Sequence, residues 1–264
     1  MTAPIGVFDS GVGGLSVLRA LRARLPAESF IYVADSGHAP YGDRSPEFVQ
    51  TRAAQVARFL TRHQAKAMVI ACNTASVLAA AKLRDTHRIP IVAMEPAIKP
   101  ATRSTKSKVV LVLATTNTIR SQSVARLCDT HGGGIRFMLQ ACPGLVDLVE
   151  GGEFSSAKTR QLLREYILPG LAEGADTIVL GCTHYHFLAS DIAAIAGPSV
   201  TIVEPCDAVA WQLARVLPSA ASASTSTALA TSFYTSGSTA HLSSFLATIG
   251  EPFEQVFALP TEEV

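Results

Sequence analysis

The sequence predicts an α/β protein that consists of two pseudo-symmetric, doubly wound domains with mainly parallel sheets. Three observations lead to this fold class. Short apolar runs alternate with helical patterns along the chain, two of these runs end in a cysteine, and the order of features recurs about 110 residues further on. Alternation of strand and helix is typical of right-handed βαβ units, which form a parallel sheet with helices on its faces.

The strands are predicted from short runs rich in Val, Ile and Leu. Such runs, when they follow helical patterns, are typical of parallel strands that are covered on both faces. In chain order they are Ile5–Phe8, Phe30–Ala34, Met68–Ala71, Ile91–Met94, Val109–Leu113, Phe137–Gln140, Thr177–Leu180 and Val200–Val203.

Helices are predicted between most of these strands. Residues 15–25 carry leucine at positions 15, 18, 21 and 25, a spacing of three to four that places the apolar side chains on one face. Residues 46–63 form a second helical pattern, with Ser45 as the expected cap and Pro46 at the first helical position. Residues 218–232 are small and polar and predict a mobile surface connection, after which Phe233 resumes a strand.

An internal repeat predicts the domain division. A displacement of 105 to 110 positions aligns Glu47-Phe48 with Glu153-Phe154, Thr51-Arg52 with Thr159-Arg160, and Cys72 with Cys182. We therefore expect a first domain of residues 1–96 plus 207–264, a second domain of residues 97–206, and an active site between them.

Composition narrows the function classes. The 264 residues are 48% hydrophobic, and 22 basic side chains nearly balance 21 acidic ones, which disfavours nucleic acid or an anionic membrane as the main partner. The five cysteines form no CxxC pair, which indicates a reduced, cytoplasmic protein without a disulfide framework. The sequence shows neither a signal-peptide pattern nor an apolar run of membrane-helix length. Small-molecule chemistry is the expectation that remains.

Cys72 and Cys182 are the leading candidates for catalysis because each follows a predicted buried strand. Ligands of open α/β sheets bind beyond the carboxyl ends of the strands. A thiol titrates close enough to neutral pH to act as base or acid, so two thiols could move a proton off one face of a small substrate and onto the other. The alternative is that both are buried small apolar side chains, the role we assign to Cys128 and Cys142.

Polar residues around the two cysteines could make them unequal. Asp9 follows the first strand and His184 lies two residues beyond Cys182, so the two thiols could differ in charge state. Ser10, Asn73, Thr74 and Thr183 offer neutral donors at strand-to-helix turns, where a substrate carboxylate is favoured. Ordinary helix capping would also explain the asparagine and threonines. The glycine-rich run after Asp9 lacks the lysine of a phosphate loop.

A zinc site is the competing interpretation of the second cysteine segment. Cys182, His184, His186 and Cys206 are residue types that ligate zinc, but their close alternation departs from common structural-zinc spacing. It would also leave Cys72 unexplained. We therefore predict no metal, and redox exchange is poorly supported because no resolving cysteine lies nearby.

Five ordered motifs resemble the aspartate/glutamate racemase family, and its glutamate racemases in particular. They are Gly6–Leu15, Ala34-Asp35-Ser36 followed by Pro40-Tyr41-Gly42, Cys72–Ala75, Gly181–Tyr185 and Phe233–Gly237, and the similarity also runs through Glu95-Pro96 and Lys99–Ala101. It covers nearly the whole chain.

The resemblance implies a cofactor-independent isomerase that interconverts L-glutamate and D-glutamate and supplies D-glutamate for peptidoglycan. It implies Cys72 and Cys182 as the two acid/base groups, with Asp9 beside the first and His184 and Glu150 near the second. The residues that it assigns to the substrate are Asp9, Ser10, Pro40, Tyr41, Gly42, Cys72, Asn73, Thr74, Thr115, Thr118, Cys182, Thr183 and His184. By analogy the protein is expected to be a homodimer.

Some positions depart from the family pattern. His186 replaces the usual proline and is expected to point into solvent, Ala97 replaces a glycine, and residues 142–147 differ from the common sequence. Two alternatives to glutamate racemisation stay open. One is a racemase for aspartate or another amino acid, and the other is a regulatory protein on this scaffold, since some relatives are linked to inhibition of DNA gyrase.

Overall fold

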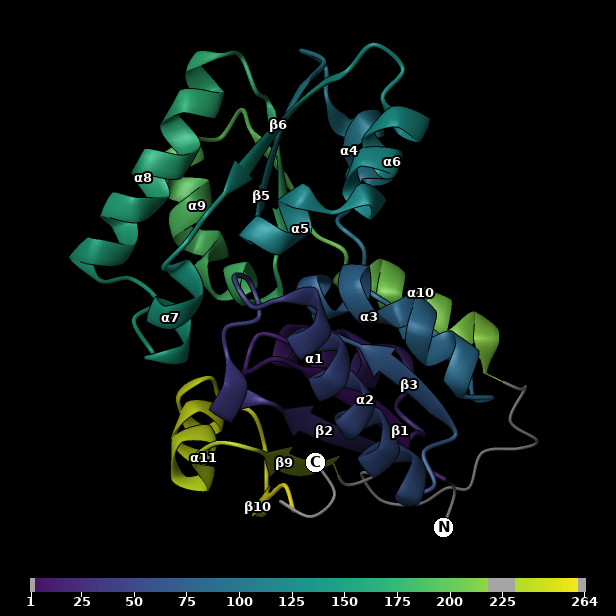
Figure 1. The fold of residues 1–264 in the computed structure, drawn as a ribbon. Coiled ribbons are helices and arrows are strands. Elements are labelled where there is room, and N and C mark those ends of the chain that lie inside the picture. Colours follow the sequence, from purple (N-terminus) through teal and green to yellow (C-terminus); the bar gives the residue numbers. More distant parts are fainter. Residues whose placement is uncertain (1–2, 218–230, 261–264) are drawn as a thin grey trace. The chain divides into compact units, whose positions relative to one another are not determined.

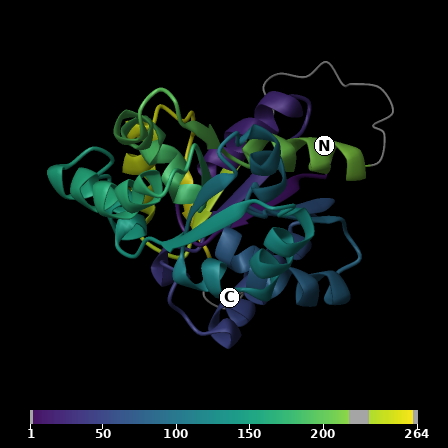
Figure 2. The same ribbon diagram turned by 90° about the horizontal axis from the view of Figure 1, so that it is seen from above.

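The computed structural model describes residues 3–217 and 231–260 (Figure 1). The chain forms two compact units. The first comprises Met1–Met94 and Cys206–Val264, and the second comprises Glu95–Pro205. Each unit contains one β-sheet with helices packed alongside it, which is visible from two directions (Figure 1, Figure 2).

The first unit has a six-stranded sheet in the order β10-β9-β2-β1-β3-β4, and every adjacent pair is parallel. The three central strands β2, β1 and β3 are buried along their whole length, which is typical of parallel strands covered on both faces. The strands are β1 (Ile5–Asp9), β2 (Phe30–Ala34), β3 (Ala67–Ile70), β4 (Ile91–Ala93), β9 (Thr231–Thr235) and β10 (Val256–Ala258).

The second unit repeats the same strand order on a smaller scale. Its sheet runs β6-β5-β7-β8, again with parallel pairs throughout. Its strands are β5 (Val109–Ala114), β6 (Arg136–Ala141), β7 (Thr177–Gly181) and β8 (Thr201–Val203). In both units the first strand lies between the second and the third, so the chain reverses direction across the sheet at equivalent points.

The helices connect these strands. In the first unit α1 packs against α10 and α2 against α3, while α8 packs against α9 in the second. They are α1 (Leu15–Arg24), η1 (Ser36–His38), α2 (Pro46–Arg62), α3 (Asn73–Thr86), α4 (Ile98–Ser104), α5 (Thr116–Arg120), α6 (Gln122–His131), α7 (Leu145–Glu150), α8 (Ala157–Ala172), η2 (Thr183–Leu188), α9 (Ala189–Ala196), α10 (Cys206–Val216) and α11 (Thr239–Thr248). Within the described ranges, no helix combines the length and apolar character that crossing a bilayer would need.

Local sequence signals define the start and the buried face of helix α2, which also carries Arg52. Ser45 caps it by accepting a hydrogen bond from the Phe48 N–H, and Pro46 occupies the first position. Its buried face carries Val49, Ala53, Val56 and Leu60, which pack in one cluster with β-strand residues and α3. Arg52 lies on that same buried face, where a charged side chain is unusual.

The predicted fold class is confirmed: the protein is α/β with two parallel sheets. The first eight strands agree with their predicted ranges to within one residue at either end. Three details were wrong. Strand β9 begins at Thr231 rather than Phe233, β10 was not predicted, and Glu153-Phe154 precede α8 whereas their counterparts lie inside α2. The rest of the predicted connection, residues 218–230, lies outside the described residues.

Asp176 makes a testable contribution to the stability of the second unit. Its carboxylate accepts hydrogen bonds from the Thr105 and Thr177 hydroxyls at 2.6 and 3.0 Å, and from the Lys106 and Ser107 N–H groups at 2.8 and 2.7 Å. These bonds outweigh the opposing effect of burial, which raises the pKa, and hold the pKa of Asp176 below its usual range.

We expect Asp176→Asn to lower Tm at pH 7 by about 5 °C, because an amide NH₂ would face donors. A carboxyl whose pKa is depressed in the folded state stabilises the protein above its unfolded pKa of about 3.9, and this contribution is lost as the pH falls. The Tm difference between wild type and variant should therefore shrink below about pH 4. Glu173→Gln is the control, since Glu173 pairs with Arg136 at an exposed position. Equal Tm for wild type and Asp176→Asn at pH 7 would contradict the prediction.

Candidate active site

The strand order places the first candidate group at the carboxyl ends of β1 and β3. These two strands are neighbours at the point where the chain reverses direction across the sheet, which is where open α/β sheets bind ligands. Asp9 ends β1, Ser10 follows it, and Cys72 lies two residues beyond β3. All three side chains are buried.

Cys72 takes part in a hydrogen-bonded series that ends on a carboxylate. Its Sγ donates to Ser10 Oγ at 3.6 Å, and Ser10 Oγ donates to Asp9 Oδ1 at 3.4 Å. The other Asp9 oxygen accepts the Gly14 N–H at 2.7 Å. We call Cys72, Ser10 and Asp9 the Cys72 relay, because the series links the thiol to a buried acceptor of protons.

The same sulfur also caps helix α3. Cys72 Sγ accepts the N–H of Ala75 at 3.4 Å, so a backbone donor at the positive end of the helix dipole points at it. This donor stabilises negative charge on the sulfur, which is the form that removes protons.

Asn73 and Thr74 form the first turn of α3 beside this thiol, and both are buried. The Asn73 side chain is 2% exposed, yet neither its amide oxygen nor its amide nitrogen has a hydrogen-bond partner in the described part of the chain. Burying an unpaired polar group costs about 1–3 kcal/mol, so a polar ligand with a donor and an acceptor would find both partners here.

The loop after β2 carries the remaining predicted residues of the first unit. Pro40 is half-buried, and Tyr41 and Gly42 are buried. The Tyr41 hydroxyl donates to Asp35 Oδ2 at 2.5 Å. Asp35 is itself held by Arg52, and the sequence pattern does not indicate this pair as part of the site.

The second candidate group lies at the carboxyl end of β7, the strand equivalent to β3. Cys182 directly follows β7, and its Sγ lies 3.8 Å from His184 Nδ1. His184 Nε2 in turn lies 2.6 Å from Glu150 Oε1, at the last residue of α7. We call Cys182, His184 and Glu150 the Cys182 relay. The structure thus places all three residues in one series.

His184 is buried, and its charge follows from its two neighbours. Burial alone lowers a histidine pKa, but the hydrogen bonds to Cys182 and Glu150 outweigh it, and the pKa of His184 is raised well above its ordinary value. This shift favours the charged form of the imidazole, and a cation at this position would stabilise a thiolate on Cys182. The Cys72 relay uses a hydroxyl at the equivalent step, so the two relays differ chemically.

Three threonines complete the predicted set in the second unit. Thr115 and Thr118 follow β5, and their hydroxyls lie 3.0 Å apart in a hydrogen bond. Thr183 follows Cys182 at the start of η2. All three residues are buried. They follow the carboxyl ends of β5 and β7, which are the counterparts of β1 and β3.

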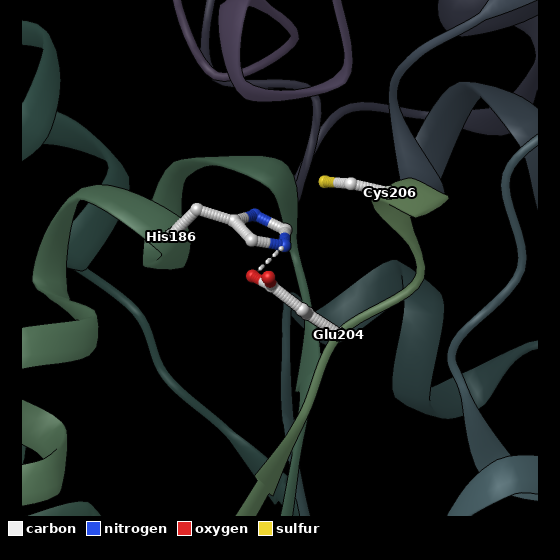
Figure 3. A group of neighbouring side chains, drawn as sticks. All are labelled: His186, Glu204 and Cys206. Atoms are coloured by element: carbon white, nitrogen blue, oxygen red, sulfur yellow. Dashed lines mark ion pairs between the residues drawn. The ribbon is translucent and has the colours of Figure 1, made fainter. Parts of the chain in front are cut away.

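His186 does not point into solvent, and the expectation that it would is wrong. Its side chain is only 7% exposed, its Nδ1 lies 2.9 Å from the Thr183 carbonyl oxygen, and its Nε2 lies 3.1 Å from Glu204 Oε2 (Figure 3). Burial lowers the pKa of His186, and the neighbouring His184 charge lowers it further, against the opposing effects of Thr183 and Glu204. The two histidines that suggested zinc thus pair with different carboxylates.

Cys128 and Cys142 occupy different surroundings from the two relay cysteines. Cys128 lies in α6 and is partly exposed, and Cys142 is buried with its Sγ donating to the Gln140 carbonyl oxygen. Burial raises the pKa of both thiols, that of Cys142 strongly. Both residues are poor candidates for proton transfer near neutral pH.

We expect Cys128→Ala to leave catalysis unchanged, since this thiol is predicted only to pack. Initial rates measured by circular dichroism, together with Tm, check this expectation. A loss of activity without loss of Tm would overturn the packing role.

The chain is similar in sequence and in structure to known proteins. Residues 5–213 match the family described as Asp/Glu/Hydantoin racemase. A glutamate racemase of Ectopseudomonas mendocina is 50% identical over 236 residues, which is 89% of this chain and 90% of that protein. The solved glutamate racemase RacE1 of Bacillus anthracis has a TM-score of 0.87 and 32% identity, over 98% of both chains.

A third relative was crystallised with ligands. The Escherichia coli glutamate racemase, in complex with L-glutamate and the activator UDP-MurNAc-ala, has a TM-score of 0.85 and 30% identity over 98% of both chains. The match to the family spans most of the chain, and the relatives at 30–50% identity extend over nearly all of it. The chain therefore belongs to the Asp/Glu/Hydantoin racemase family.

Proposed function

We propose that the protein interconverts L-glutamate and D-glutamate without a cofactor, with Cys72 and Cys182 as the two acid/base groups. The observation that carries the proposal is the pair of buried thiols at equivalent strand ends, each of which leads through a relay to a carboxylate. The two relatives named above from Ectopseudomonas mendocina and Escherichia coli are glutamate racemases, which supports glutamate as the substrate.

In the proposed reaction, one cysteine acts as thiolate and the other as thiol. The thiolate removes the Cα proton of one enantiomer, and the electron pair of the broken C–H bond is delocalised into the α-carboxylate. The thiol of the other cysteine delivers its proton to the opposite face of Cα. The first cysteine ends as a thiol and the second as a thiolate, which is the state required for the reverse direction.

The relays fit this exchange of roles. The Ala75 N–H stabilises a thiolate on Cys72, and the charged imidazole of His184 stabilises one on Cys182. Preorganised donors of this kind offset the cost of forming charge in a buried site. Asn73, Thr74, Thr183 and the Thr115–Thr118 pair would bind the substrate carboxylates and ammonium group, with Ser10, Pro40, Tyr41 and Gly42 from the first unit.

The test is polarimetry or circular dichroism of D-glutamate incubated with protein that was dialysed against a chelator and freed of small molecules. We expect the optical signal to decay to zero, and L-glutamate to decay to the same end point. Parallel assays with both enantiomers of aspartate separate the two substrates by kcat/KM. If aspartate is racemised and glutamate is not, the assigned substrate changes to aspartate. If neither is racemised, the proposed function is rejected.

The role in peptidoglycan synthesis follows from the proposed reaction. Expression of the chain in a strain that requires external D-glutamate should restore growth without it, whereas the double variant Cys72→Ala/Cys182→Ala should not. Growth supported equally by both proteins would contradict this role. The expected homodimer stays a prediction, which light scattering of the purified protein checks.

A further inference from the structure

The first unit contains a buried ion pair that the proposed reaction does not use. Asp35 directly follows β2 and is fully buried, and Arg52 lies on the apolar face of α2 with a side chain 9% exposed. Arg52 Nε and Nη2 bind the two Asp35 oxygens at 2.9 and 2.7 Å, which is the bidentate geometry.

The pair binds the loop that follows β2. The Tyr41 hydroxyl donates to Asp35 Oδ2 at 2.5 Å, and His38 Nδ1 lies 3.1 Å from Asp35 Oδ1. We call Asp35, Arg52 and Tyr41 the Asp35 cluster. Because one carboxylate binds side chains from positions 38 and 41, it fixes both ends of the segment that contains Pro40.

The same carboxylate residue connects to the Cys72 relay. The Asp35 N–H donates to the carbonyl oxygen of Asp9 at 2.9 Å, at the carboxyl end of β1. The Tyr41 ring belongs to the same buried apolar cluster as Cys72 and Ala75. Burial, followed by the charges of Asp35 and Cys72, raises the pKa of Tyr41 well above its ordinary value, so its hydroxyl stays a neutral donor.

Stability alone does not explain a buried ion pair at this position. Replacement of such pairs by well-packed apolar residues is often neutral or stabilising, because taking two charges out of water is costly. The repeat offers a comparison within the chain: counted from the capping residues Ser45 and Ser156, the position of Arg52 in α2 corresponds in α8 to Leu163, a fully buried apolar residue. The buried pair is therefore not a requirement of the repeated fold.

We propose that Asp35 and Arg52 are positioning residues that hold Tyr41 and the loop of residues 38–42 against the Cys72 relay. This inference rests on the proposed function for its effect on substrate binding. The pair acts through Tyr41, and it fixes the loop backbone beside the thiol without touching the reacting atoms.

The test compares Arg52→Lys, Asp35→Asn and Tyr41→Phe with wild type. Arg52→Lys keeps the charge but loses the bidentate geometry, and Tyr41→Phe keeps the ring but loses the hydroxyl. We expect each to raise KM for glutamate about tenfold, as the loss of a charge-assisted hydrogen bond predicts, with a smaller effect on kcat.

A second readout does not depend on racemase activity. Iodoacetamide labelling, quantified for each cysteine by peptide mass spectrometry, should be several-fold faster at Cys72 in the three variants and unchanged at Cys182. Arg19→Lys is the matched control: it alters another arginine of the first unit, which binds the buried Glu251, and should lower Tm without changing KM or Cys72 labelling.

The outcomes distinguish the two proposals. Lower Tm with unchanged KM and unchanged Cys72 labelling in the folded variants would make the Asp35 cluster purely structural and overturn the inference. If wild type fails to racemise glutamate, the proposed function fails, while labelling of Cys72 still decides whether the cluster positions the loop.

Discussion

Replacing either Cys72 or Cys182 with alanine should lower kcat/KM for glutamate racemisation by at least about 10³-fold, because each change removes one of two required acid/base groups. The loss should be equal in both directions, since the equilibrium constant between enantiomers is one and kcat/KM must be the same for each. Both variants should stay folded, because only one sulfur atom is removed from each buried site, and Tm should fall more in Cys72→Ala because the cap of α3 is lost there.

Deuterium exchange separates the roles of the two thiols. In D₂O a single remaining thiolate can remove the Cα proton from one face and return deuterium to that same face, without inversion. We therefore expect Cys72→Ala and Cys182→Ala to catalyse exchange of opposite enantiomers, as followed by NMR. Cys142→Ala, a buried cysteine of the second unit, is the control and should racemise normally. Racemisation by either relay variant, or exchange of the same enantiomer by both, would refute the two-thiol mechanism.

Glu150→Gln should lower kcat about 100-fold, because it removes the carboxylate that lies 2.6 Å from His184 and stabilises its charged form. A neutral imidazole can no longer stabilise the Cys182 thiolate as a cation does. Steady-state kinetics with each enantiomer measure the loss.

The loss of Glu150 should also change how kcat/KM depends on pH. His184 has a raised pKa, so its protonated form is kept at neutral pH and is lost as the pH rises through that pKa. Without Glu150 the pKa falls, and the alkaline limb of the kcat/KM profile should move to lower pH. Any stabilisation of the fold by charged His184 should be lost as the pH rises, and at lower pH in Glu150→Gln than in wild type.

Glu153→Gln is the matched control, since Glu153 is an exposed carboxylate three residues further along. It should leave both kcat and the pH profile unchanged. An unshifted profile in Glu150→Gln would show that the carboxylate does not set the charge of His184, and the Cys182 relay would then end at the imidazole.

The strands and the two cysteines could be predicted because their signals are local. An apolar run of about five residues, rich in β-branched residues and set between helical patterns, predicts a buried strand, and Cys72 and Cys182 each follow such a run. Strand β10 has only three residues, two of them exposed, and its pairing with β9 comes from the sheet rather than from its own sequence. Such a strand has no local signature.

The partners of the cysteines depend on contacts between residues that are distant in sequence. Glu150 reaches His184 across 34 positions, and Asp35 meets Arg52 from a different element, so no spacing rule predicts either contact. A signal for Arg52 did exist. It falls on the apolar stripe of α2 between Val49 and Val56, and a charge on a buried face predicts a buried partner. The error at His186 has the same origin, because its carboxylate partner Glu204 lies 18 residues away, in the connection between β8 and α10.

The chain enters the second unit at Glu95 and returns to the first at Cys206, which orders events during synthesis. The second unit is one continuous segment and is complete once residue 205 has been made. The first sheet lacks β9 and β10 until residues 231–258 have been made, so the edge of β2 that pairs with β9 stays open. The Cys182 relay can thus assemble on a nascent chain whose first unit is still unfinished.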